Sequence, residues 1–252
     1  MGEPAAGVFV TGTGTEVGKT VVAAAIAHTL AAEGKRVAVF KPAVTGLDEL
    51  PADGPISRRG GDLSAHRPLA DHELLRMGAG SGQSDEEIAP YRYGPPASPH
   101  LAAEMAGEEI EPGRLLAAAR TAAASADALV CEGVGGLLVP LAGRLCKPMG
   151  DKSAPPYLVR DFAADLGLPL VVAASPGLGT INHTLLTIEV ARAAGLEVAA
   201  VVLTPWPTEP SEIERSNRDT IASLGDVPVQ VLPHLDPAHP GTWPPLQVPM
   251  GR

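Results

Sequence analysis

Residues 12–20 read Gly-Thr-Gly-Thr-Glu-Val-Gly-Lys-Thr, and this glycine-rich stretch decides the fold. The apolar run at residues 8–10 predicts a buried strand, and residues 19–33 predict a mostly buried helix that stops at Gly34. A turn between a strand and a helix points backbone N–H groups at one spot, where the helix N-terminus adds a partial positive charge. The stretch therefore predicts a phosphate-binding loop.

Two side chains of this loop indicate a nucleoside triphosphate. Lys19 is placed to reach the β- and γ-phosphates, and the Thr20 hydroxyl is placed to ligate Mg²⁺. The spacing departs from the common rule at one position, because Thr13 stands where that rule has glycine. A purely structural turn is the alternative, but the strand before the loop and the helix after it favour phosphate binding.

The alternation of strands and helices continues along the chain. Residues 37–40 predict a second strand, which a right-handed crossover joins to the first. Further strands are predicted at residues 128–131, 170–174, 198–203 and 227–232, and further helices at 98–106, 111–125, 157–166, 181–194 and 209–224. Such repeated units predict an α/β fold with a doubly wound, mainly parallel sheet of the P-loop NTPase type. Without an internal repeat or a long linker, residues 1–252 are expected to form one domain.

Two regions break this rhythm. Residues 47–97 are rich in Gly, Pro, Asp and Ser, so we expect a long irregular loop region with one helix inside residues 62–77. Gly78 to Gly82 are typical of a mobile surface loop. The proline-rich tail from about residue 236 is expected to be irregular.

Composition argues against several classes of protein. The formal net charge of -10 argues against a nucleic-acid binder, and the absence of a long apolar run argues against a membrane span. We find no pattern of a signal peptide. The two cysteines, Cys131 in an apolar run and Cys146 in a loop-like stretch, are too few for a disulfide framework. A soluble enzyme of the reducing cytoplasm is expected.

Acidic and basic side chains at strand ends predict the rest of the site. Glu132 directly follows the strand at residues 128–131, and carboxyl ends of parallel strands are where ligands bind in such sheets. Glu132 is therefore a candidate Mg²⁺ ligand, and Asp62 is a second, although the local sequence around Asp62 favours a helix N-cap. Lys41 closes the strand at 37–40, where it either neutralises an anion or faces solvent at the sheet edge.

Taken together, five stretches resemble the dethiobiotin synthetase family in order and spacing over about residues 7–235. They are residues 10–20, Lys41-Pro42-Ala43-Val44-Thr45-Gly46, Ser98-Pro99-His100, Cys131-Glu132-Gly133-Val134-Gly135-Gly136, and Gly177-Leu178-Gly179-Thr180-Ile181-Asn182-His183. The resemblance implies an ATP- and Mg²⁺-dependent ligase. Its substrates would be 7,8-diaminononanoate and CO₂, and a carbamate and its mixed anhydride with phosphate would precede ring closure to dethiobiotin. It also implies a homodimer with substrate near the subunit boundary.

The resemblance implies roles for individual residues. Thr20, Asp62 and Glu132 would ligate Mg²⁺, while Lys19 and Lys41 would be the catalytic cations. Substrate would be bound by Lys41, Thr45 and, from a neighbouring subunit, Asn182. The nucleotide would be bound by Glu16, Val17, Gly18, Lys19, Thr20, Val21, Asp62, Glu132, Gly133, Val134, Gly135, Thr204, Pro205, Pro233, His234 and Leu235.

The chain departs from the family after the strand at residues 198–203. The family often has an Asn there to read adenine, whereas this chain has Thr204, which lacks the donor and acceptor pair of an amide. Another nucleoside triphosphate is therefore a possible co-substrate. His100 and His183 match family motifs and His28 does not, but packing is the usual role of a helical histidine.

Three alternatives compete with this interpretation. Amidoligases that act on larger carboxylates such as cobyrinate carry a glutaminase domain, for which this chain has no spare length. Partition and septum-placing ATPases carry a second lysine five residues before the loop lysine, where this chain has Gly14. A family member with altered substrate or lost activity is the third alternative, which the changed base contacts and enlarged loops favour, but the phosphate loop and the acids are intact.

Overall fold

The computed structural model describes residues 6–50, 68–143 and 155–251. In these ranges, six strands form one parallel sheet in the order β2-β3-β1-β6-β7-β8. The strands are β1 (Ala6–Gly12), β2 (Val37–Phe40), β3 (Ala128–Glu132), β6 (Leu170–Ala174), β7 (Val198–Trp206) and β8 (Val229–Pro233). The predicted α/β fold with a mainly parallel sheet is confirmed.

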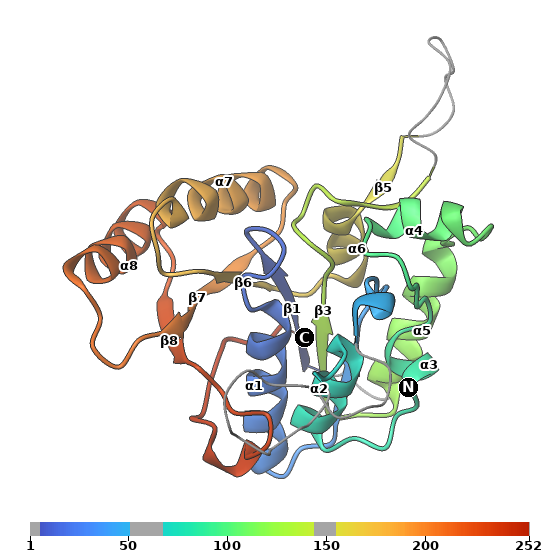
Figure 1. Ribbon diagram of the computed structural model, residues 1–252, viewed down its shortest axis with the longest axis horizontal. Coiled ribbons are helices and arrows are strands. Elements are labelled where there is room, and N and C mark those ends of the chain that lie inside the picture. Colours follow the sequence, from blue (N-terminus) through green and yellow to red (C-terminus); the bar gives the residue numbers. More distant parts are fainter. Residues whose placement is uncertain (1–5, 51–67, 144–154, 252) are drawn as a thin grey trace.

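Helices cover both faces of this sheet (Figure 1). One face packs against α1 (Lys19–Ala32) and α2 (Asp71–Ala79). The other face packs against α4 (Pro99–Met105), α5 (Pro112–Ala124) and α6 (Val159–Leu166) on one half, and against α7 (Thr180–Ala193) and α8 (Glu212–Gly225) on the other. The sheet is therefore doubly wound, as the sequence predicts.

Alternating side chains of the central strand explain why both faces are covered. In β1, Val8 and Val10 join the core under α1, whereas Phe9 points to the opposite core. The three phenylalanines of the chain meet in that second core, where the Phe162 ring lies 6.1 Å from the rings of both Phe9 and Phe40. Small aliphatic residues fill most of the remaining space, in keeping with the low aromatic content.

The strand order creates a switch point at β1. The chain moves outward from β1 to β2, returns to β3 beside β1, and then crosses to β6 on the other side of β1. Ligands of open α/β sheets bind beyond the carboxyl ends of the strands at such a point. The loop after β1 and the residues after β3 both lie there.

The region between β2 and α4 is more regular than the sequence predicts. A short 3₁₀ turn at Leu47–Glu49, the helix α2 and the short helix α3 (Asp85–Ile88) occupy its described part. The prediction of a mobile loop at Gly78 to Gly82 is wrong for the first two residues, because Gly78 and Ala79 are the buried last residues of α2. The composition misleads because the small residues Gly78 and Ala79 are the end of a helix, where Gly78 packs closely on the α1 backbone at Ala24.

The segment after α2 also closes the outer edge of the sheet. The Gln83 side-chain amide accepts a hydrogen bond from Val39 N at 2.8 Å and donates one to Val39 O at 3.0 Å. A little further along, Lys41 N donates to Ile88 O at 2.8 Å. One side chain thus makes the two backbone bonds that a neighbouring strand would make on β2.

The tail after β8 is mostly irregular, as predicted, but it packs on α1. Trp243 is buried, its Nε1 donates to Asp236 O at 2.8 Å, and its ring lies edge-on to His28 at 5.4 Å. Leu246 N donates to the Thr29 hydroxyl at 2.8 Å. The tail thereby completes the core beneath α1.

The boundaries of the predicted elements are close to those of the structure. β7 runs on to Trp206, and a two-stranded antiparallel pair of β4 (Pro140–Ala142) and β5 (Tyr157–Leu158) is an element that the sequence does not predict. In the described part of the chain, every helix is too short or too polar to cross a bilayer.

Replacing Trp243 with Ala tests the contribution of the tail. We expect the free energy of unfolding to fall by about 3 kcal/mol in urea titrations, because a large buried ring is lost from the core. Leu224→Ala is the matched control at a 66% exposed position, and it should change that free energy by less than about 0.5 kcal/mol. Equal values for the two variants would show that the tail contributes little to stability.

Candidate functional site

The loop after β1 has the backbone of a phosphate cradle. Gly18 has φ of 87°, and a Cβ atom on it would lie 2.5 Å from Thr204 Cγ2. A Cβ atom on Gly12 would lie 2.7 Å from Val17 Cγ2. Glycine is therefore required at both positions, the first for its left-handed conformation and both for close packing. α1 begins directly after Gly18, so its free N–H groups face the loop.

An open cleft of about 820 Å³ lies against this loop. Most of the predicted site residues line it: Glu16, Gly18, Lys19, Thr20, Val21, Lys41, Thr45, Glu132, Val134 and Gly135. The loop, the end of β2 and the end of β3 thus meet in one cleft, as their places at strand ends predict. The remaining wall comes from segments around Glu49, Asp71 and Pro99.

A buried lysine joins two carboxylates at the floor of the cleft. Lys41 Nζ lies 2.5 Å from Glu132 Oε1 and 2.9 Å from Asp71 Oδ2, and the Lys41 side chain is only 3% exposed. Its ammonium also lies 3.5 Å from Gly133 O. The sequence left two alternatives for Lys41, a side chain that neutralises an anion and a side chain that faces solvent. The structure excludes the second.

The Thr20 hydroxyl lies on the other side of the same carboxylates. Its oxygen is 3.0 Å from Asp71 Oδ1 and 3.0 Å from Glu132 Oε1. Among the described residues, the buried Glu132 Oε2 has no hydrogen-bond partner. A hydroxyl and two carboxylates, one of which has an unsatisfied buried oxygen, form the hard oxygen donor set that Mg²⁺ prefers. The residues present therefore fit a magnesium ion.

The charges in this cluster determine its protonation. Burial opposes the charged form of Lys41, but Asp71 and Glu132 outweigh it and raise the pKa of Lys41 above its ordinary value. The Lys41 charge in turn lowers the pKa of Asp71, against the effect of burial. For the fully buried Glu132, burial raises the pKa and Lys41 opposes the shift. Lys41 is therefore an ammonium at neutral pH and cannot serve as a base.

Lys19 lies near this cluster but bonds to its own loop. Its Nζ donates to Gly14 O at 2.6 Å. Burial lowers the pKa of Lys19, Glu132 and Asp71 raise it, and the Lys41 charge adds to the lowering. Two lysines thus line the cleft that holds the Asp71 and Glu132 carboxylates.

Asp71 is a site residue that the sequence interpretation missed. The predicted second acid, Asp62, lies outside the described residues, whereas Asp71 starts α2 and reaches both Thr20 and Lys41. Locally, Asp71 is an ordinary acid in a first helical turn, next to the Ala70 and Glu73 backbone cap. Only the packing of α2 on α1 brings it to the loop.

Comparison with known proteins agrees with this geometry. A sequence profile of the AAA domain family matches residues 6–240. The ATP-dependent dethiobiotin synthetase BioD of Rhodococcus erythropolis strain PR4 is 39% identical over 222 residues, which are 88% of this chain and 85% of that protein. The chain belongs to the dethiobiotin synthetase family. The corresponding protein of Bacillus subtilis strain 168 is 32% identical over 223 residues, which are 88% of this chain and 84% of that protein.

Solved structures add only a distant likeness. The cell division ATPase MinD of Pyrococcus furiosus superposes with a TM-score of 0.46 at 16% identity, over 92% of this chain and 84% of that one. A likeness at this level carries no argument about function.

The remaining residues suggested by the dethiobiotin synthetase family lie away from the cleft wall. Thr204 is 2% exposed and packs against Gly18, so its side chain has no open surface on which to bind a base. Leu235 is buried in the core, whereas Pro205, Pro233 and His234 are exposed. The nucleotide-binding roles of these five residues stay predictions.

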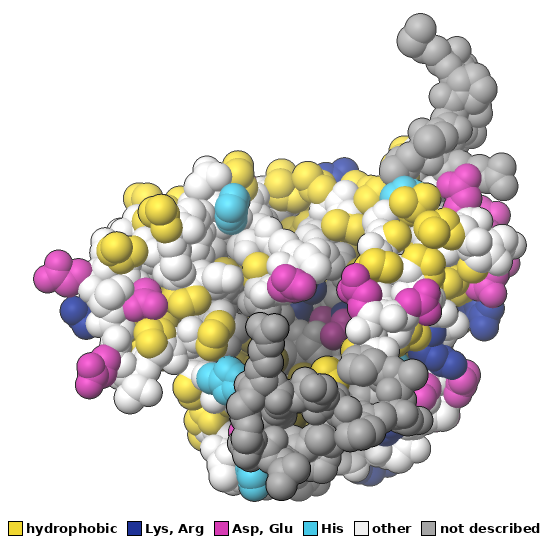
Figure 2. Space-filling model, in the orientation of Figure 1, with side chains coloured by type: hydrophobic (Ala, Val, Ile, Leu, Met, Phe, Trp, Pro, Cys, Tyr) yellow, Lys and Arg dark blue, Asp and Glu magenta, His cyan; other side chains and the backbone are white. Residues whose placement is uncertain are grey.

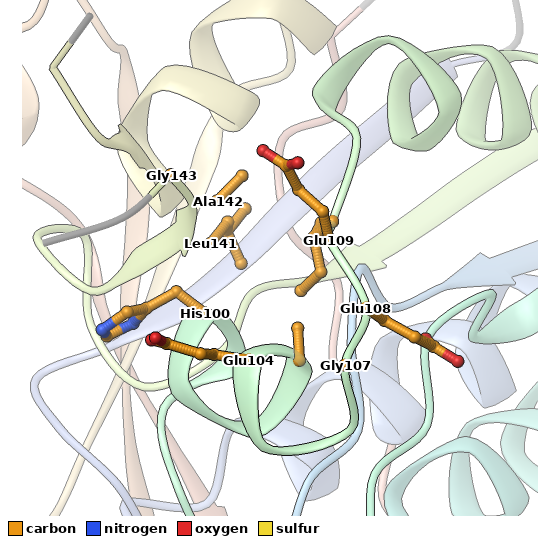
Figure 3. A pocket seen from close by; sticks show the side chains of 10 residues that line it. His100, Glu104, Gly107, Glu108, Glu109, Leu141, Ala142 and Gly143 are labelled. Carbon is orange, nitrogen blue, oxygen red and sulfur yellow. The ribbon is translucent and has the colours of Figure 1, made fainter. Parts of the chain in front are cut away.

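Two further family positions have their own surroundings. Asn182 is exposed near the start of α7, outside the cleft. His100 lines a smaller cavity of about 230 Å³ with Glu104 of α4 and with Leu141 of β4 (Figure 3). This cavity is separate from the loop and holds none of the predicted catalytic residues.

Replacing Asp71 with Asn tests the carboxylate at the head of α2. We expect Mg²⁺ binding in the presence of a non-hydrolysable ATP analogue, measured by calorimetry, to weaken at least about tenfold, because the loss of even a supporting group costs that much at metal sites. Asp62→Asn is the comparison variant. If Asp62→Asn alone weakens the binding, the sequence prediction holds and the assignment to Asp71 is wrong.

Proposed function

We propose that this protein closes the ureido ring of dethiobiotin from 7,8-diaminononanoate and CO₂ with hydrolysis of ATP. The observation that carries the proposal is the buried pair of Lys41 and Glu132, joined by the partly exposed Asp71 and Thr20, beside a phosphate-binding loop. Membership of the dethiobiotin synthetase family supports the same reaction. The large open cleft in front of the cluster has room for a nucleotide and a small second substrate.

Thr20, Asp71 and Glu132 would hold a magnesium ion, and the unsatisfied Glu132 Oε2 supports this. When bound, the ion would spread the negative charge of the triphosphate during phosphoryl transfer. The chain itself supplies the backbone cradle at Gly18, the N-terminus of α1 and the Lys19 ammonium. Lys19 would leave Gly14 O and bind the phosphates, since a phosphate is a stronger partner than a neutral carbonyl.

The proposed chemistry takes three steps. One amine of the substrate attacks CO₂ and loses a proton, which gives a carbamate. A carbamate oxygen then attacks the γ-phosphorus, the bond to ADP breaks, and a carbamic–phosphoric anhydride forms. The second amine attacks the carbonyl carbon of the anhydride, phosphate leaves with the electron pair of the broken C–O bond, and the amine loses a proton as the ring closes.

The chain needs only to position anions and to stabilise charge in these steps. The ammonium of Lys41 lies at the floor of the cleft, between the phosphate loop and Gly133. Because its pKa is raised, Lys41 offers a fixed positive charge to the carbamate and to the phosphoryl group as it moves. Thr45, which lines the same cleft, would hydrogen-bond the substrate.

A homodimer in the cytoplasm forms part of the proposal. Several large apolar side chains are exposed near the start of α7 and around α4, among them Leu178 (97%), Leu186 (55%) and Met105 (61%). Hydrophobic side chains gather on this side of the molecule, over α7 and over the region of α4 (Figure 2). Covering them in a symmetric contact would place Asn182, in the same region, within a shared site.

The decisive assay follows phosphate release from ATP with Mg²⁺ and bicarbonate, with and without 7,8-diaminononanoate, and repeats it with CTP and GTP. We expect release to depend on the diamine and dethiobiotin to appear in equal amount, because the anhydride forms only on the carbamate. The buried Thr204 side chain leads us to expect that the base is weakly discriminated. Release that is indifferent to the diamine with every nucleotide would contradict the proposed reaction.

Replacing Lys41 with Ala tests the fixed charge. Turnover should fall by about 10²–10³-fold, the effect of removing one group that stabilises a transition state, while nucleotide binding stays mostly unchanged. Lys35→Ala is the matched control, since Lys35 is exposed and paired only with Glu33 among the described residues. Turnover of Lys41→Ala equal to that of the control would remove Lys41 from this role.

A further inference from the structure

The two carboxylates of the cluster are held in different ways. Thr20 belongs to α1, and Lys41 and Glu132 belong to the ends of neighbouring strands, so the sheet and its loop fix these three. Asp71 comes from α2, which is not hydrogen-bonded into the sheet. Its carboxylate nevertheless lies 3.0 Å from the Thr20 hydroxyl and 2.9 Å from Lys41 Nζ. The position of Asp71 therefore depends on how α2 packs on α1.

The two helices approach each other closely at Gly78. A Cβ atom on Gly78 would lie 2.5 Å from Ala24 O, 2.9 Å from Ala24 Cα and 3.0 Å from Ala24 C. All three are backbone atoms inside α1, and they cannot rotate away as a flexible side chain would. A larger residue at this position has to push α2 away from α1.

Glycine also has a low helix propensity, so its presence inside α2 needs an explanation. Gly78 lies in the last turn of α2, where alanine would form helix more readily. A glycine at such a position usually has a packing reason, and here that reason is the close contact with α1. Gly78 and Asp71 belong to the same short helix, about 10 Å apart along its axis. Thr20 and Ala24 are one turn apart on α1, so the Gly78 contact lies directly beyond the Asp71 contact.

We propose that Gly78 is a positioning residue, which sets the distance between α1 and α2. It thereby holds the Asp71 carboxylate so close to the Thr20 hydroxyl that both can bind one magnesium ion. This inference rests on the proposed magnesium site. Mg²⁺ requires bonds of about 2.0–2.1 Å in near-ideal octahedral geometry, whereas Ca²⁺ accepts bonds of about 2.3–2.6 Å in flexible geometry. A displaced Asp71 therefore harms Mg²⁺ binding more than Ca²⁺ binding, which a general loss of stability would not do.

The test is calorimetry of Mg²⁺ and of Ca²⁺ binding to the full chain with a non-hydrolysable ATP analogue. In Gly78→Ala we expect the Kd for Mg²⁺ to rise by about tenfold to a hundredfold, the scale of effect of a misplacement near 1 Å, and the Kd for Ca²⁺ to rise much less. Gly82→Ala is the matched control, because a Cβ atom there meets nothing within 4 Å and the same segment carries it. Equal Mg²⁺ affinity in Gly78→Ala and Gly82→Ala would overturn the inference, as would equal losses for the two ions.

A second variant covers the case in which Gly78→Ala does not fold. Asp71→Glu lengthens the side chain by one methylene. It does not change the contact between Gly78 and Ala24, because Asp71 is the first residue of α2 and Gly78 lies near its end. It should shift the ion preference from Mg²⁺ toward Ca²⁺, and in the Gly78→Ala background it should restore part of the Mg²⁺ affinity. Unchanged Mg²⁺ affinity in Asp71→Glu would overturn the inference. If the unsubstituted protein binds no Mg²⁺ with the nucleotide, the proposed function fails instead.

Discussion

The buried contact of the Lys41 ammonium with Asp71 and Glu132 is the interaction on which the rest of the site depends. Lys41 and Glu132 are both buried, and either of them would be costly to bury without a partner, whereas the Asp71 side chain is 45% exposed. Together they join the end of β2, the end of β3 and the head of α2. The cluster therefore couples the packing of these three elements to the charge at the floor of the cleft.

The order of the strands makes this contact possible. β2 and β3 are neighbours although almost 90 residues of chain separate them, and their parallel pairing brings Lys41 and Glu132 to the same edge of the sheet. β1 lies on the other side of β3 and sends the phosphate loop to that edge as well. The phosphate-binding backbone, Lys41 and Glu132 thus converge because the sheet itself aligns them.

Much of this arrangement follows from the sequence, and the exceptions have physical causes. The loop, Lys41 and Glu132 were predictable because each sits at the carboxyl end of an apolar run, and parallel strands bring such ends together. Asp71 was not, because its local pattern is that of any helix start and only the tertiary contact at Gly78 distinguishes it. Buried Thr204 likewise looks like a loop residue until its packing against Gly18 is seen.

The Gln83 amide has a consequence for the protein in crowded solution. β2 is an edge strand, and free backbone groups on such an edge invite a strand from another molecule to pair with them and begin aggregation. At Val39, in this strand of four residues, both groups are already bonded to one side chain. An incoming strand must first displace that amide and then the neighbouring bond of Lys41 N to Ile88 O. The segment from Asp71 to Ile88 thus also prevents another molecule from pairing with the edge strand β2.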